Sequence, residues 1–489
     1  MSQKSSKINE SIISGALKFS ISSWANLIIG PLAIVITTRL LSPDTYGIVN
    51  LFIAFADVLM YIIALGFDGA LIRFYNEPPL HDTRNQLMYK CITISIAFGI
   101  VFGLLAVLLL GDLLSSTVFG FSSRVIIALV FIYALERLIL RYLNISFRMA
   151  FNSLQFNIQN ILNNCLMRLL VILGAFFLTD SLYIVATISI GYAFLVMTYL
   201  LIQKNQIMPY SDTGRLNFSL SLRGYGEYIK YAFFSAPTYI INYANTFLSL
   251  QIIRFFCGTY FVGIFSSASV FGSIVAALSG GFSTYWMAYV YKNYSRDQNR
   301  IKKMHSFVLL FAIVMASLFV VFRDVLFLFI GADYHESKSF YSLLLIAPLC
   351  NFIAVTTIVG IGISKKNHLQ LITTILAIVL NLVLSFFLIQ TAGVIGAAIA
   401  NAVSSMVQFF LNSFFGQRYY STIEKKTKSI VGIVLLIVIL VLPALFSDMF
   451  VLLLAVLFVD FLAAGIFIHE IKRIGFLVCK KFKEMSAEL

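Results

Sequence analysis

Charged residues are scarce in this chain of 489 residues. Only 11% of them are Asp, Glu, Lys or Arg, whereas 60% are hydrophobic, and the mean hydropathy is +0.93. A water-soluble protein of this length could not hide that much apolar surface from solvent. The scarcity of charge therefore excludes a soluble globular protein and predicts that the chain folds within a lipid bilayer.

Residue types and motifs on which many enzymes depend are also rare or missing. The five cysteines are scattered without a CxxC pair, so we expect neither a disulfide framework nor a zinc site. The five histidines are dispersed, and we expect all of them in loops, with no metal cluster. There is no GxxxxGK(S/T) loop, which argues against ATP hydrolysis. We predict a protein that is not an enzyme and has no cofactor or metal.

Apolar runs, each about 20 residues long, fill the chain instead. Each run is long enough to cross the ~30 Å hydrocarbon core of a bilayer as a helix. The runs cover 17–38, 47–72, 90–111, 122–143, 153–178, 181–202, 229–253, 260–290, 304–322, 339–363, 368–389, 393–415, 429–446 and 449–468. The fold class that they predict is an all-α polytopic membrane protein with about 14 transmembrane helices.

The placement of the basic residues predicts the orientation. The formal net charge of +14 is compatible with a nucleic-acid partner. However, if the N-terminus is cytoplasmic and the helices alternate, the inside segments hold 27 of the 35 Lys and Arg residues. This is the ordinary bias of a membrane protein. We expect both termini in the cytoplasm and no nucleic-acid partner.

The two halves of the chain share a pattern that indicates an internal repeat. Arg39 ends the first run and is followed by Gly47, and Arg254 and Gly263 stand in the same relation after the seventh run. Both copies start on the same membrane side, so the repeat is parallel. We predict two six-helix bundles in pseudo-two-fold arrangement plus a C-terminal helix pair. The predicted parts are 1–203, a cytoplasmic linker 204–228, 229–416, and 417–489 with the pair and a basic tail.

The fourth run carries a polar stripe. Arg137, Arg141, Asn144 and Arg148 are spaced by 4, 3 and 4 residues and share one helix face. Because a cation facing lipid is costly, the stripe should face a water-filled cavity or a buried partner. Arg141 and Arg148 also fit a simpler role as markers of the cytoplasmic helix end. Glu136 lies about 100° round the helix, so it cannot neutralise the whole stripe.

The fifth run is rich in amides. Its polar residues are Asn152, Gln155, Gln159, Asn160, Asn163, Asn164 and Arg168. Amides both donate and accept hydrogen bonds, which suits sugar hydroxyls, although they also join neighbouring helices within a membrane. We expect Arg168, near mid-membrane, to converge with Arg137 on one anion.

Other polar groups lie on the second and seventh runs. Asp57 could pair with an arginine, titrate during ion coupling or pack against a neighbour, and the sequence leaves these roles open. Tyr239 and Tyr243 offer flat rings with hydroxyl groups, which suit sugar rings. Asp68, near the cytoplasmic end of its run, is expected to anchor a loop.

Three stretches resemble a known family. They are Arg39-Leu40-Leu41-Ser42-Pro43-Asp44-Thr45-Tyr46-Gly47, the stretch from Gly66 to Arg73, and Asn381-Leu382 followed by Gly393 to Ala400. On these residues the chain resembles the polysaccharide-exporter branch of the multidrug/oligosaccharidyl-lipid/polysaccharide flippases, the Wzx-type O-antigen flippases. Helix number, orientation and linker fit the same resemblance over the whole length.

The resemblance implies a function. Such proteins move undecaprenyl-diphosphate-linked oligosaccharide from the cytoplasmic to the outer leaflet of the bacterial inner membrane by alternating access. The product enters lipopolysaccharide O-antigen or capsule-type polysaccharide, so membrane lipids, a polysaccharide polymerase and a chain-length regulator are expected partners. Coupling to H⁺ or Na⁺ is left open.

We assign the site residues on this basis. The expected diphosphate ligands are Arg137, Arg141, Arg168, Arg39 and Arg254. The expected sugar ligands are Asn160, Asn163, Asn164, Gln159, Tyr239 and Tyr243. Asp57 and Glu136 are the expected coupling residues or charge partners.

Three alternatives remain open. A lipid II flippase belongs to the same superfamily. A cation-coupled multidrug antiporter would favour acids over arginines in its cavity, and the acids here are few. A membrane polysaccharide polymerase should need a large outer loop, which the pattern of runs does not contain.

Overall fold

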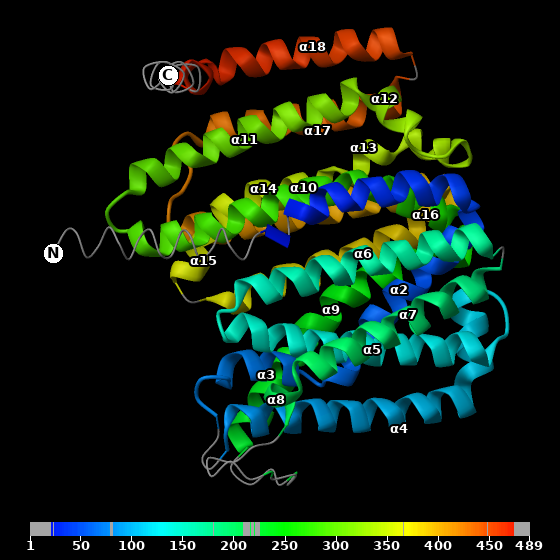
Figure 1. The fold of residues 1–489 in the computed structure, drawn as a ribbon. Coiled ribbons are helices and arrows are strands. Elements are labelled where there is room, and N and C mark those ends of the chain that lie inside the picture. The colour runs from blue at the N-terminus through cyan, green and yellow to red at the C-terminus, as the bar shows by residue number, and fades with distance from the viewer. Residues whose placement is uncertain are drawn as a thin grey trace, which may run out of the picture. The chain divides into compact units, whose positions relative to one another are not determined.

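The computed structural model describes residues 21–22, 24–78, 82–178, 180–208, 216, 220, 225–364, 366–446 and 448–473. Its regular elements are all helices (Figure 1), which confirms the all-α prediction. The start of the first run, most of the linker 204–228 and the end of the basic tail lie outside the described residues.

The chain forms two compact units, Met1–Ser266 and Ser267–Leu489. The first contains a helix at Trp24–Leu40, then α2 (Pro43–Ala64), α3 (Phe67–Phe74), α4 (Arg84–Phe119), α5 (Arg124–Met149), α6 (Ser153–Phe177), α7 (Ser181–Ile202), α8 (Lys204–Ile207), α9 (Gly226–Cys257) and the start of α10 (Thr259–Asn293). The second contains the rest of α10, then α11 (Gln298–Val321), α12 (Arg323–Leu328), η1 (Ala332–Ser339), α13 (Tyr341–Leu344), α14 (Ile346–Thr357), α15 (Val359–Ile363), α16 (Asn367–Tyr419), α17 (Lys426–Leu445) and α18 (Met449–Ile466).

The protein is a multi-pass membrane protein. Within the described residues, nine helices are long and apolar enough to cross a bilayer, or ten if the bent pair Ala332–Ser339 and Tyr341–Thr357 forms one span. Two expected runs merge in α16, which is kinked at Gly393 (φ 57°, ψ −142°). The helices α5 and α9 are not among the nine, although both are long enough, because polar residues interrupt their apolar sequence.

The central helix of the first unit is α2. It packs against α4, α5, α7 and α9, and Leu51, Phe52 and Ile63 are fully buried. Its start is set by sequence: the Ser42 hydroxyl accepts a hydrogen bond from the Thr45 backbone N–H, and a proline follows the cap. A helix that is apolar apart from a few polar residues on one face is expected in such a buried position.

The second run is not one helix, as its expected span of 47–72 implied. It breaks between α2 and α3, because Leu65 (φ 51°) and Gly66 (φ 76°) adopt left-handed conformations. A Cβ atom added at Gly66 would lie 2.1 Å from the backbone oxygen of Ala232 in α9. Only glycine allows this close approach. The break places Asp68 inside the unit, where it is fully buried and pairs with Arg141, whereas the sequence predicts that it anchors a loop.

The glycines of the repeated pattern meet within the first unit. A Cβ atom added at Gly47 would lie 2.1 Å from the Thr259 oxygen, and one added at Gly263 would lie 2.0 Å from the Pro43 oxygen. The Thr259 hydroxyl also donates a hydrogen bond to Asp44 Oδ1 at 2.7 Å. The first turns of α2 and α10 are therefore in direct backbone contact.

In the second unit, α11, α17 and α18 pack side by side (Figure 1). The prediction that every histidine lies in a loop is wrong, because His335 lies in η1, His368 in the first turn of α16, and His305 inside α11, where it is buried. The two ring nitrogens of His305 lie 2.8 Å from the hydroxyls of Thr356 and Ser429. These hydrogen bonds join α11 to α14 and to the first turn of α17, which explains how a polar ring is accommodated there.

Candidate functional site

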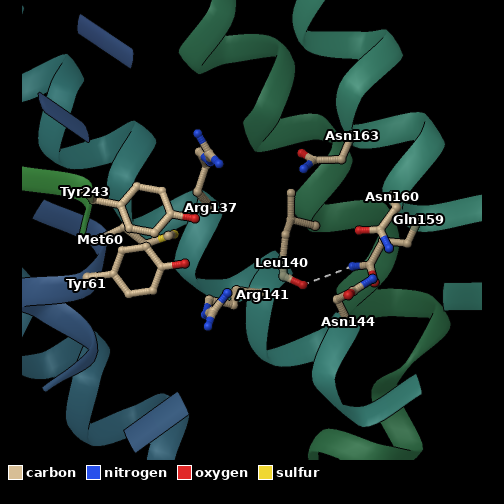
Figure 2. A pocket seen from close by; sticks show the side chains of 10 residues that line it. All are labelled: Met60, Tyr61, Arg137, Leu140, Arg141, Asn144, Gln159, Asn160, Asn163 and Tyr243. Carbon is tan, nitrogen blue, oxygen red and sulfur yellow. Dashed lines mark hydrogen bonds between the residues drawn. The ribbon is translucent and has the colours of Figure 1, made fainter. Parts of the chain in front are cut away.

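The first unit contains a cavity of about 180 Å³ between α2, α5, α6 and α9 (Figure 2). It is lined by Met60, Tyr61, Arg137, Leu140, Arg141, Asn144, Gln159, Asn160, Asn163 and Tyr243. Eight of these ten side chains are polar. Polar side chains within a bundle of membrane-spanning helices are costly unless they line a cavity or contact a polar partner. We therefore take this cavity as the candidate functional site.

Two arginines one helical turn apart on α5 supply the positive charge of the cavity. Arg137 Nη1 lies 2.6 Å from Asp57 Oδ1 of α2. Arg141 contacts Asp68 of α3 through two nitrogens, with Nη2 at 2.6 Å and Nε at 2.7 Å from Oδ2. Each arginine therefore has one carboxylate partner, and the four groups together are electrically neutral. The acids hold the guanidinium groups in place while leaving them at the cavity wall.

Tyrosine rings stand beside the arginines. Tyr61 stacks on Tyr243 with ring centroids 4.3 Å apart and on Tyr239 at 5.6 Å. The Arg141 guanidinium lies 4.8 Å from the centroid of the Tyr61 ring, which is a cation–π contact. Figure 2 shows the Tyr61 and Tyr243 rings side by side next to Arg137 and Arg141. Together they form a flat, amphipathic wall.

Amides form the opposite wall, as Figure 2 shows. The Asn144 side-chain nitrogen donates to Gln159 Oε1 at 3.0 Å, and Gln159 Nε2 donates to the Leu140 backbone oxygen at 3.2 Å. Asn163 Oδ1 is buried and has no hydrogen-bond partner among the residues that the structure describes. A buried acceptor without a donor is costly, so a hydroxyl group in the cavity would find a ready partner at Asn163.

The structure brings together six of the predicted ligands at this cavity: Arg137, Arg141, Gln159, Asn160, Asn163 and Tyr243. Tyr239 lies behind Tyr61 and does not line it. Asp57 holds Arg137, which is one of the three roles left open for it. Glu136 is buried, and its Oε2 atom has no hydrogen-bond partner. It makes no ion pair within the described residues.

Other predicted ligands lie elsewhere. Arg168 does not line this cavity with Arg137, and its Nη1 donates to the Gly30 backbone oxygen at 2.9 Å. Arg254 donates to the backbone oxygens of Ser116 and Thr117. Arg39 is exposed, and neither Arg39 nor Asn164 lines the cavity. The second arginine that lines the cavity beside Arg137 is therefore Arg141 and not Arg168.

Sequence reasoning missed two parts of the site. Tyr61 shares a helix face with Asp57, four residues away, and this spacing was the available signal. The role of Asp68 had no such signal, because it depends on the break at Gly66. Within the described residues, no group of three or more His, Cys, Asp or Glu side chains could hold a metal ion.

The sequence profile of a family described as "Polysaccharide biosynthesis protein" matches residues 13–291, which is more than half of the chain and includes every residue of the cavity. The chain belongs to the polysaccharide biosynthesis protein family. The predicted resemblance to the polysaccharide-exporter branch is thereby confirmed. This match, together with the transporter fold described next, agrees with the prediction that the protein is not an enzyme.

Solved structures share its fold. The inward closed conformation of the lipid II flippase MurJ is 16% identical with a TM-score of 0.68, covering 93% of this chain and 99% of that one. The MATE multidrug transporter DinF-BH is 16% identical with a TM-score of 0.61, covering 85% of this chain and 96% of that one. An inward-facing multidrug resistance MATE family transporter is 15% identical with a TM-score of 0.56, covering 82% of this chain and 97% of that one. A search of curated proteins found no match.

Proposed function

We propose that this protein is a flippase that moves undecaprenyl-diphosphate-linked oligosaccharide from the cytoplasmic to the outer leaflet of the bacterial inner membrane by alternating access. The observation that carries the proposal is the cavity in which Arg137 and Arg141 meet a tyrosine wall and an amide wall. Such a substrate has a diphosphate, a sugar and an apolar tail, and the first two match these surfaces. The family also acts in polysaccharide biosynthesis.

The arginines suit the diphosphate. A guanidinium presents a planar fork of donors to phosphate oxygens. Arg137 and Arg141 are one turn apart on α5, so both can reach one diphosphate. In the structure their partners are Asp57 and Asp68. Binding is therefore an exchange in which phosphate oxygens replace carboxylates, and the acids keep the arginines oriented between transport cycles.

The remaining walls suit a sugar. Rings such as those of Tyr61 and Tyr243 stack on the apolar faces of pyranoses, and their hydroxyl groups reach the rim. Asn160 and Asn163 can donate to and accept from sugar hydroxyls. The lipid tail needs no apolar pocket, because it can remain in the bilayer while the head group crosses.

Ion coupling fits the same residues. A diphosphate that takes over Arg137 leaves the Asp57 carboxylate without its cation in a site of low dielectric, next to further negative charge. Proton uptake or Na⁺ binding would relieve this repulsion. Glu136, the next residue in sequence to Arg137, is a second buried carboxyl available for an ion. We propose Asp57 and Glu136 as the coupling residues.

The wider architecture follows the same proposal. We propose 14 spans: the ten described above with the bent pair counted as one, the helix Trp24–Leu40, α5, α9, and one more because α16 contains two expected runs. The matched contacts of Gly47 and Gly263 support two related bundles. We also propose cytoplasmic termini, and a polysaccharide polymerase and chain-length regulator as partners in O-antigen or capsule-type assembly.

Gene deletion tests this function. In the producing strain, loss of the protein should trap lipid-linked oligosaccharide on the inner leaflet and remove surface glycan, and a plasmid copy should restore both. Normal surface glycan with new drug sensitivity would favour an antiporter. Cell lysis with lipid II trapped inside would favour a lipid II flippase instead.

A further inference from the structure

A second cavity, of about 280 Å³, lies in the second unit and has no part in the proposed flippase site. It is lined by Lys303, Ser306, Phe307, Glu424, Lys425, Lys428, His469, Glu470 and Arg473. These residues come from α11, from the start of α17 and from the segment that follows α18. The lining is therefore drawn from three helices that pack together.

The lining has an excess of positive charge. Lys428 is ion-paired with Glu470 at 2.6 Å, so these two charges offset each other. The other charged groups are Lys303, Lys425, Arg473 and Glu424, which leave a net charge of +2 with His469 neutral. Within the described residues, none of these three cations is ion-paired, and all three are exposed. The Arg473 guanidinium lies 5.8 Å from the centroid of the Phe307 ring, a cation–π contact that holds it at the pocket wall.

The walls of this basic pocket are held by buried contacts. His305, two residues after Lys303, is hydrogen-bonded to Ser429 of α17. The Lys428 ammonium joins α17 to Glu470 and lies 4.6 Å from the Phe467 ring centroid. These contacts fix α11, α17 and the end of α18 against one another. The pocket is thus preformed, which lowers the entropy cost of binding.

The depth of the pocket points to the ligand. Lys303 lies in the second turn of α11, Lys425 caps α17 and Arg473 follows α18, so all three cations stand where apolar helices end. Lipid phosphates lie at this level. Exposed apolar side chains follow Lys425 and precede Arg473 in the sequence, at Ile430 and Ile471, and they suit acyl chains. A basic pocket between helices, with apolar surface beside it, is the expected form of a phospholipid headgroup site.

We propose that this pocket binds the phosphate group of an anionic phospholipid. Lys303, Lys425 and Arg473 contact the phosphate, and the acyl chains lie along the lipid-facing side of α17 and α18. The site is separate from the cavity of the first unit, and the proposal does not depend on what that cavity transports. A soluble phosphate has the same chemistry and is the alternative source.

The test uses the full-length protein in detergent, titrated with phosphatidylglycerol, with phosphatidylcholine and with inorganic phosphate. Native mass spectrometry counts the bound molecules. The pocket variant is Lys303→Gln/Lys425→Gln/Arg473→Gln. The control variant, Arg296→Gln/Arg300→Gln/Arg418→Gln, removes the same charge from exposed positions of the same unit that do not line the pocket. Each cation near a lipid surface contributes about a five-fold effect on affinity.

We expect phosphatidylglycerol to bind the wild type and the control variant with equal affinity, and the pocket variant about 100-fold more weakly. Phosphatidylcholine and inorganic phosphate should bind weakly to all three. Equal phosphatidylglycerol affinity in both variants would overturn the proposal, and so would tighter binding of inorganic phosphate than of lipid. The pocket variant keeps the His305 and Lys428 contacts that hold the walls. If it nevertheless fails to fold, Lys303→Gln alone should weaken binding about five-fold, and unchanged affinity in that variant would contradict the site.

Discussion

At the residue scale, the candidate site depends on two arginines whose carboxylate partners come from different helices. Asp57 is on α2 and Asp68 is on α3, beyond the break at Gly66. Removing an arginine alone would leave a buried carboxylate unpaired, which is itself strongly destabilising. Any test of ligand binding must therefore separate the loss of a ligand contact from the loss of an internal ion pair.

The double variant Arg137→Ala/Asp57→Asn makes this separation. It removes both charges, so the fold should tolerate it better than Arg137→Ala alone. If Arg137 binds the diphosphate, the double variant should still bind a soluble diphosphate diester about 10- to 150-fold more weakly, which corresponds to one ionic hydrogen bond. Arg141→Lys should recover only part of the affinity lost in Arg141→Ala, because lysine lacks the planar fork.

The measurements are calorimetric titration of the purified protein and surface glycan in a complemented null strain at matched expression. Arg124→Ala is the matched control, because its ion pair with Asp112 is exposed and lies outside the cavity. Wild-type affinity in the double variant would leave Arg137 with a purely structural role.

Arg168 gives a second prediction at this scale. Its hydrogen bond to the Gly30 oxygen joins α6 to the helix Trp24–Leu40. We expect Arg168→Ala to lower the apparent melting temperature, because the loss of a charged hydrogen bond costs about 1.5–3 kcal/mol. Its diphosphate affinity should stay within about two-fold of the wild-type value, because Arg168 does not line the cavity. A ten-fold loss of affinity with unchanged stability would restore Arg168 as a ligand.

At the element scale, the polar helix faces were visible in the sequence because their spacing matches the helical period. The stripe of Arg137, Arg141 and Asn144 does line a cavity. The role of Asp68 could not be predicted, because it depends on two left-handed residues after α2. Apolar periodicity reports which segments are helical, but it does not report the small backbone rotations that decide which face meets which neighbour.

The contact between α2 and α10 gives a prediction for whole elements. An alanine at Gly47 or Gly263 would place its Cβ atom within about 2 Å of a backbone oxygen. The two helix starts would have to separate, at a cost of about 1–3 kcal/mol for overpacking. We expect each variant to melt at a lower temperature than the wild type. Gly465→Ala is the control, since an added Cβ there meets nothing within 4 Å, and it should not be destabilising.

At the scale of the whole molecule, the basic loops predict the topology. Single cysteines at Ser5, Ser211 and Ser486, which lie outside the described residues, should resist a membrane-impermeant thiol reagent in intact cells. A cysteine on the opposite side should react. The sequence pattern places the loop that contains Ser337 on that outer side, but Ser337 is buried. Ser339 in the same loop is exposed and is the better site for the cysteine. Labelling at any of the first three positions would overturn the predicted orientation.

Two features of the sequence support the predicted topology: the charge bias of the loops and the internal repeat. Charge bias is counted over many loops and tolerates local errors, which is why orientation can be predicted from sequence. The repeat is carried by a few positions, and only the close approach of Gly47 and Gly263 gives it a physical reason. Which arginine Asp57 and Asp68 each contact could not be predicted, because these ion pairs join segments far apart in the chain.

Coupling between substrate and ion is a property of the whole transport cycle, and the cavity predicts its sign for protons. In the structure Asp57 is paired with Arg137 and Asp68 with Arg141. A bound diphosphate competes for the Arg137 guanidinium and adds negative charge, so it favours protonation of the displaced Asp57 carboxylate. By linkage, binding should take up protons, and affinity should therefore rise as the pH falls.

This linkage can be measured with a diphosphate diester that keeps its charge over the pH range used, so that only the protein titrates. Wild-type affinity should increase on acidification. The increase should be smaller in Asp57→Asn, which cannot take up a proton, while Glu136→Gln tests the neighbouring buried carboxyl. Calorimetry in two buffers of different ionisation enthalpy counts the protons directly. If affinity is independent of pH but rises with Na⁺, the displaced carboxylates bind the metal ion instead. If affinity depends on neither ion, Asp57 serves only to orient Arg137, and the coupling must involve other residues.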